Sequence, residues 1–204
     1  MIMKRFAVVA IGLAIFAGPP AIGQNYVSDA EPFIGAVAAR DGNKATSLLD
    51  TRPTLVNSRN LKGQIALNIV IARNDESWLH FLLSKGADPN LAASNGDTPL
   101  IAAARVGFTD AIELLLSRGA KVNTANRMGE TPLIIAVQQR QLPAVKLLLA
   151  KGADPDKRDT AAGYSAREYA KRDTRNRELL AAIEASKTPA AKPKSDDLDS
   201  FKLN

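Results

Sequence analysis

The 204-residue sequence has no cysteine and only one histidine, His80. Without cysteine the chain can form no disulfide, no thiolate metal site and no cysteine nucleophile, so its stability must come from packing. A single histidine cannot complete a zinc ligand set, and neither a nucleophile-elbow motif nor a phosphate-binding glycine loop accompanies it. We therefore expect no catalytic residue, no metal and no cofactor, and we interpret the chain as a binding protein that is not an enzyme.

Long hydrophobic runs are also scarce. The run from Phe6 to Ala17 has 12 uncharged residues, which is too short to span a bilayer. It follows Lys4 and Arg5 and ends before a Gly-Pro-Pro break, and Gly23 is one of the small residues that a signal peptidase reads. This order is typical of a secretory signal. We expect residues 1–23 to be a signal peptide and the product to be periplasmic or secreted, without a permanent membrane anchor.

Charge of one sign is not concentrated along the repeats, although the formal net charge is +6. Lysine and arginine alternate with acidic residues, which favours a solvated surface over a nucleic-acid footprint, so we expect no nucleic-acid partner. The last segment, Ser186 to Asn204, consists mainly of proline, lysine and small residues, with few residues that a core could bury. Such a composition predicts a disordered tail.

What the sequence does contain is a repeat with a period of 33 residues. Each copy combines a turn motif, an Ala-rich helix and a Leu-rich helix, and one such unit cannot bury its apolar faces without a neighbour. The repeated positions are Gly63, Gly96 and Gly129; Gly86, Gly119 and Gly152, each followed by Ala; and Asn57, Asn90, Asn123 and Asp156.

The copy from Ala93 to Ala125 explains the spacing within a unit. Thr98 can cap the first helix and Pro99 suits its first position, where no amide hydrogen bond is lost. Gly107 ends that helix, and the Asn123 side chain can hydrogen-bond the backbone of the adjoining hairpin. These residues are interpreted as builders of the fold and not as a site.

The Thr-Pro-Leu and Gly-Ala motifs at this period resemble those of ankyrin-repeat proteins, and we expect an exported bacterial type. The resemblance implies an all-α solenoid of helix-turn-helix units with short projecting β-hairpin loops. Five units are expected within an ankyrin-repeat domain of residues 24–185: residues 27–57, 60–92, 93–125, 126–158 and a polar C-terminal cap at 159–185. Where the family often has histidine, Asn68, Ile101 and Ile134 stand, so the hydrogen bonding across repeats that this histidine provides is expected to be missing.

The resemblance also implies that a partner protein binds at the hairpin tips and the concave face of the first helices. We expect an exported adaptor or scaffold that is a monomer; the alternative is an inhibitor or immunity-type partner of an exported enzyme. The expected contact positions vary between copies and hold no aromatic residue: Lys62, Gln64, Arg73, Asn95, Asp97, Arg105, Arg127, Met128, Glu130, Gln138 and Gln139.

The signal assignment predicts cleavage after Gly23. Intact-mass measurement of the exported form should then show a chain that begins at Gln24, because the small residues before that position fit a signal peptidase. A product that keeps Met1 and stays in the membrane fraction would contradict the assignment.

Overall fold

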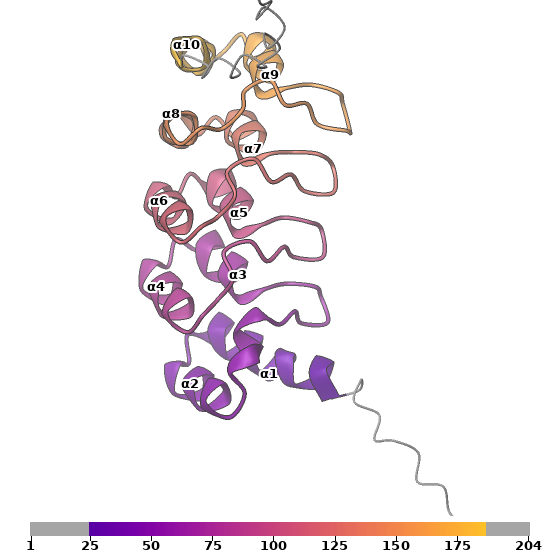
Figure 1. Ribbon diagram of the computed structural model, residues 1–204, viewed down its shortest axis with the longest axis vertical. Coiled ribbons are helices and arrows are strands. Elements are labelled where there is room, and N and C mark those ends of the chain that lie inside the picture. Colours follow the sequence, from indigo (N-terminus) through magenta and orange to yellow (C-terminus); the bar gives the residue numbers. More distant parts are fainter. Residues whose placement is uncertain (1–24, 187–204) are drawn as a thin grey trace, which may run out of the picture.

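The computed structural model describes residues 25–186, which form ten α-helices arranged as five stacked pairs (Figure 1). The predicted signal peptide and all but the first residue of the predicted tail lie outside these residues. The first helices are α1 (Asn25–Ala39), α3 (Ala66–Ala72), α5 (Pro99–Val106), α7 (Pro132–Gln138) and α9 (Ala166–Arg172); the second helices are α2 (Gly42–Thr51), α4 (Glu76–Ser84), α6 (Thr109–Ser117), α8 (Leu142–Ala150) and α10 (Arg177–Ala185).

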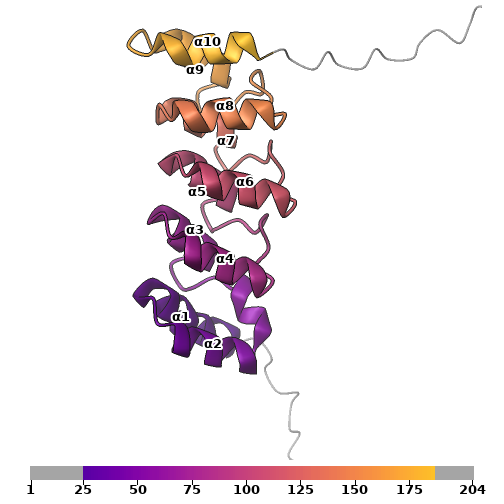
Figure 2. The same ribbon diagram turned by 90° about the vertical axis from the view of Figure 1, so that its left-hand side faces the viewer.

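The all-α solenoid is confirmed, and the first and second helices form two parallel layers (Figures 1 and 2). The loops turn back as hairpins, yet within residues 25–186 no β-strand forms, and one isolated bridge joins Arg158 to Ser165. The first pair leaves differently from the others, through a 3₁₀ helix, η1 (Pro53–Asn57).

Helix starts and ends follow the predicted chemistry. The Thr98 hydroxyl accepts a hydrogen bond from the Ile101 amide at 3.3 Å, and Pro99 opens α5. Gly107 ends α5 with φ of +72°, a conformation that costs glycine little. Ile65 replaces the capping threonine before α3 and makes no side-chain cap bond there.

A single core runs through the stack because each first helix packs against the next one. Leu100, Leu115, Leu133 and Leu148 are fully buried and belong to this core. The small residues of α5, such as Ala103 and Ala104, are buried as well. The apolar faces that one unit cannot cover are therefore covered by its neighbours.

A ladder of asparagine side chains joins successive units on the side of the second helices. Each side chain binds the turn that follows the second helix of the next unit. Its N–H group donates to a backbone carbonyl, and its oxygen accepts a hydrogen bond from a backbone amide. The bonds run from Asn57 to Gly86 O (3.0 Å) and Asp88 N (2.7 Å), from Asn90 to Gly119 O (3.0 Å) and Lys121 N (2.9 Å), and from Asn123 to Gly152 O (3.3 Å) and Asp154 N (2.9 Å). Asn123 thus makes side-chain bonds to the backbone as predicted, but its partners lie in the turn after α8 and not in a hairpin.

The ladder ends where its asparagine becomes Asp156. A carboxylate cannot donate to a further carbonyl, and Asp156 instead binds the Arg167 guanidinium at 2.7 Å. The last unit closes locally: Ser165 and Glu168 form a capping box at the start of α9. Its polarity agrees with the predicted role of a terminal cap.

The prediction of missing cross-repeat bonds was wrong at one of its three positions. The Asn68 side-chain N–H donates to the Asp97 carbonyl of the next hairpin at 3.1 Å. At the other two positions Ile101 and Ile134 are fully buried, so apolar packing replaces a polar bond there.

Carboxyl groups in the last unit are held in their charged form. Burial alone would raise the pKa of Asp159, but hydrogen bonds from Tyr169 and from two backbone amides hold that pKa below its usual value. Burial, together with the 2.6 Å bond to Asp159, raises the pKa of Tyr169 to about 12. Lowered pKa values are found at four carboxyl groups in or against this unit: Asp156 beside Arg167, Asp159 beneath Tyr169, Glu168 on the Ser165 amide and Asp173 beside Arg140.

Replacing Leu115 or Leu148 by alanine should lower the free energy of unfolding by about 2–5 kcal/mol, because each side chain is fully buried and would leave a cavity. The control is His80→Ala, since 54% of that side chain is exposed and it only approaches Glu76 at 3.7 Å; this change should cost less than about 0.5 kcal/mol. Denaturant titration measures both, and equal losses would contradict this register of the second helices.

Acid should open the last unit before the central ones. Groups with a lowered folded-state pKa stabilise the fold above their unfolded pKa of about 4, and this contribution is lost as the pH falls through the folded value. Hydrogen exchange from pH 5 to pH 2.5 should therefore show α9 and α10 losing protection while α5 to α8 keep it. Simultaneous loss in all helices would refute this order.

Candidate functional site

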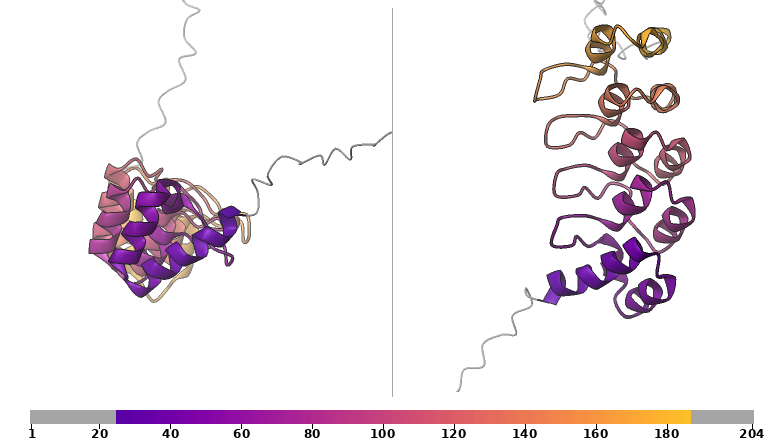
Figure 3. Two further views of the ribbon diagram at one scale, coloured as in Figure 1. Left: turned by 90° about the horizontal axis from the view of Figure 1, so that it is seen from below. Right: turned by 180° about the vertical axis from the view of Figure 1, so that it is seen from behind.

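Four hairpin loops project from the stack on the side of the first helices and follow one another along it (Figure 3, right). Each hairpin is closed by a backbone bond across its base, and backbone bonds between neighbouring hairpins link the first to the second and the third to the fourth. The closing bonds are Asn60 N to Gln64 O, Ala93 N to Asp97 O, Asn126 N to Glu130 O and Asp159 N to Tyr164 O; the links are Ser94 N to Gly63 O and Thr160 N to Met128 O, both 2.9 Å.

Two glycines let the hairpins approach one another. Gly96 has φ of +87°, and a Cβ there would lie 2.6 Å from the Arg127 nitrogen. Gly129 has φ of +76°, and its Cβ would lie 2.5 Å from the Thr160 nitrogen. Any side chain would clash with the next hairpin's backbone, so these repeated glycines fix the spacing of the loops.

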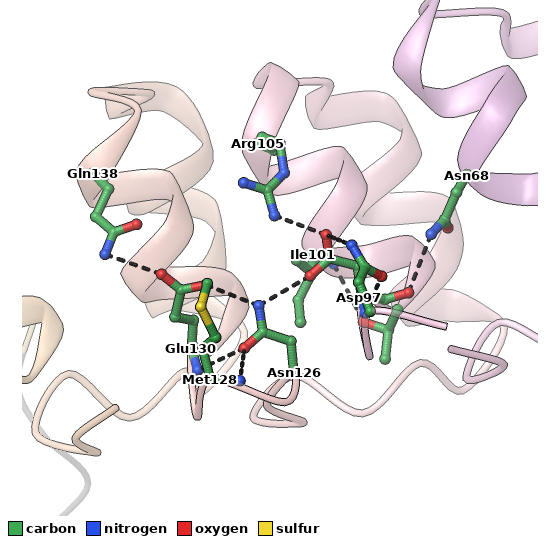
Figure 4. A network of polar contacts seen from close by, with 10 residues as sticks. Asn68, Asp97, Ile101, Arg105, Asn126, Met128, Glu130 and Gln138 are labelled. Atoms are coloured by element: carbon green, nitrogen blue, oxygen red, sulfur yellow. Dashed lines mark hydrogen bonds and ion pairs between the residues drawn. The ribbon is translucent and has the colours of Figure 1, made fainter. Parts of the chain in front are cut away.

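Asp97 is the centre of a polar network at the base of the hairpins (Figure 4). Its Oδ2 accepts from Arg105 at 2.8 Å and from Asn95 at 2.9 Å, and its Oδ1 accepts from Asn126 of the next hairpin at 3.0 Å. Glu130 has the equivalent place one unit on. It accepts from Asn126 at 2.8 Å and from Gln138 at 3.3 Å.

Asp97 and Glu130 therefore differ from the exposed tip contacts that the sequence suggested. Each residue is only 8% exposed, and hydrogen bonds within the chain engage its carboxylate. They hold the side chains around them in place and do not reach outward. Arg73 is similarly engaged: it donates to the Val37 and Ala38 carbonyls at 2.9 Å and pairs with Asp75 at 3.1 Å.

The differences between hairpins compensate one another. Asn126 bonds the Glu130 amide and side chain, and Asn60 bonds those of Gln64 in the same way. Ala93 stands at this position in the second hairpin and has no amide to offer. Asn95 takes over both bonds to Asp97. Variation at these positions thus preserves one hydrogen-bonding scheme.

A groove of about 530 Å³ lies between the first two hairpins and helices α3 and α5. We call it the α3/α5 groove. Five of the predicted contact residues line it together: Lys62, Gln64, Asn95, Asp97 and Arg105. Its apolar part is made by Ile69, Ala72, Ala93, Ala102 and Val106.

The groove exists because small residues stand where the neighbouring unit has large ones. The 33-residue period pairs Ala72 with Arg105, Ala93 with Asn126 and Ala102 with Ile135. Nothing fills the missing volume, since Ile69 and Val106 beside it stay partly exposed. This signal is present in the sequence, where a comparison of side-chain sizes between copies could have found it.

The available charge of the groove is positive. Asp97 is the only acidic residue among those lining it, and Arg105 already neutralises it. Lys62 stands exposed on the hairpin and forms no ion pair within the described residues. The Asn68 Oδ1 atom is buried beside the groove without a hydrogen-bond partner in the described part of the chain. The groove therefore offers an apolar floor, a free cation and a free acceptor.

The remaining predicted contacts lie along the stack. Met128 is 51% exposed on the third hairpin, beside the exposed Arg127. Gln139 is exposed at the end of α7. Gln138 lines a separate hollow with Arg140, Arg172 and Arg175. The structure thus brings five of the eleven predicted contacts together and leaves six outside the α3/α5 groove: these four, Arg73 and Glu130.

Residues 25–186 hold neither a metal-binding cluster nor a membrane-spanning helix. The described side chains contain no cluster of three acidic, histidine or cysteine residues that could hold a metal ion. In the same part of the chain, no helix has both the length and the apolar character needed to cross a membrane.

The stacked helix pairs and their linked hairpins define a solenoid repeat protein that acts through its surface. The family model for ankyrin repeats (3 copies) matches residues 33–126 and, in an overlapping alignment, residues 67–159, which together exceed half of the sequence. The chain belongs to the ankyrin-repeat family, whose repeats are protein-interaction modules. The last unit lies outside both matches. No match was found among curated proteins.

Proposed function

We propose that this chain is an exported adaptor that binds a segment of another protein in the α3/α5 groove. The observation that carries the proposal is the unfilled groove between α3, α5 and two hairpins that a backbone bond from Ser94 to Gly63 holds together. The secretory pattern of residues 1–23 supports export to the periplasm or beyond.

Preorganisation is the mechanism that we assign to it. The floor residues belong to α3 and α5, and hydrogen bonds within the chain already hold Asn95 and Arg105 on the rim. Binding would then cost little in ordering loops or side chains. The groove has no aromatic anchor among its lining residues, so its affinity should be modest unless the partner supplies one.

Ala102→Ile is the sharpest test, because it fills the groove with the residue that the next unit carries. The mature protein should retain its partner from periplasmic extract, and Ala102→Ile should lose it without a fall in Tm. The matched control is Ala181→Ile on the exposed face of α10, which should retain the partner. If both variants capture equally, the groove is not the binding site.

The same experiment separates the adaptor from the alternative. An inhibitor or immunity-type role predicts one tightly held exported enzyme whose activity is suppressed on binding. Several weaker partners are expected of an adaptor. Measuring the activity of any retained enzyme, with and without the chain, decides between them.

A further inference from the structure

We propose that, in the absence of a partner, the α3/α5 groove is occupied by this chain's own C-terminal segment, residues 196–201. The sequence of that segment is Asp-Asp-Leu-Asp-Ser-Phe. This goes beyond the proposed function, because it makes the groove self-blocked and requires a partner to displace the segment.

Charge and shape of the groove fit such a segment. The exposed Lys62 ammonium and the outer edge of Arg105, whose side chain is 41% exposed, present positive charge at the rim. Ala72 and Ala102 leave room on the floor for an apolar side chain. The unpartnered Asn68 Oδ1 is buried beside the groove, and a turn of this amide toward an extended chain would let it accept a backbone N–H.

The segment supplies the complementary groups. Asp196, Asp197 and Asp199 carry three negative charges within four positions, and Leu198 lies between them. Phe201 adds the aromatic side chain that the groove lining lacks. The residues between Ser186 and this segment are instead basic, with Lys187, Lys192 and Lys194, so the acidic end is distinct from the stretch that tethers it.

The tether is long enough. The described chain ends at Ser186, just after α10, and Leu198 follows 12 residues later. At about 3.3 Å per residue these can span up to about 40 Å. Stacked helices lie about 8–10 Å apart, so the groove between α3 and α5 is about 20–30 Å along the stack from α9. The tether starts one helix layer behind α9, at the end of α10, so the segment reaches the groove when the tether is nearly extended. Figure 2 shows α10 at the end of this straight stack.

Weak contacts suffice for such an occupant. A tethered segment acts at an effective concentration on the order of 1 mM, so a peptide with a Kd near that value would dock for about half of the time. A partner that binds more tightly displaces it. Because the rim contacts are electrostatic and exposed, added salt should release the segment.

The absence of cysteine makes the test direct. A nitroxide is attached to Ser200→Cys in the full-length mature chain, and amide signals are recorded with the label oxidised and reduced. Selective loss of signal is expected at Gln64, Asn68 and Asn95, while His80 and Glu113 on the second helices keep full intensity. Lys62→Glu should restore the groove signals, and Lys121→Glu, an equal charge change away from the groove, should not.

Three results would overturn the proposal. The first is that no amide signal is selectively lost, or that signals are lost only around the hollow at Arg140, Arg172 and Arg175. The second is a loss of amide signal at the groove that stays complete in Lys62→Glu or in 0.5 M salt. The third is a loss of amide signal that disappears when the nitroxide-labelled chain is diluted with chain that carries no nitroxide, because such a loss would come from contact between copies. The measurement needs no partner, so it stands or fails independently of the capture experiment.

Discussion

The apolar faces of α3, α5 and α7 are buried against one another and against the second helices, and everything else in this molecule depends on the burial between neighbouring units. A unit without its neighbour would expose Leu100 or Leu133, each worth roughly 1.5–3 kcal/mol when fully buried. The 33-residue period reflects this constraint, since it returns each first helix to the place where it packs against the one before it. Hairpins, turns and asparagine bonds all keep each unit in the register that burial demands.

Polar groups then decide where the stack continues and where it stops. Asn57, Asn90 and Asn123 can both donate and accept, so each binds the unit that follows it. Asp156 can only accept, and its carboxylate binds the Arg167 guanidinium instead. One change from amide to carboxylate thus marks the end of the ladder, and the last unit secures itself with the Tyr169–Asp159 bond instead.

The sequence predicted the scaffold well because its local rules agree with one another. Thr98, Pro99 and Gly107 each favour the same helix boundaries, and the repeat shows which residues must face a neighbour. The candidate site was harder. Asp97 and Glu130 vary between copies as surface residues do, but their variation is compensated: Asn95 takes the part of the asparagine that Ala93 replaces. Single-position variation could not reveal that, because the compensation lies two residues away on a folded loop.

Residues that differ from the repeat are therefore of two kinds, according to whether another side chain makes up for what the substitution removes. Where Ala93 replaces asparagine, another side chain restores the lost bonds, and the fold is preserved. Where Ala72 and Ala102 replace arginine or isoleucine, nothing restores the lost volume, and partly exposed apolar surface remains beside a free cation. Filling that space would bury more apolar area, so a scaffold under selection for stability alone would have filled it. The unfilled departure is accordingly the one that we propose for binding, and this proposal puts the site in the second and third units and not at the more variable tips.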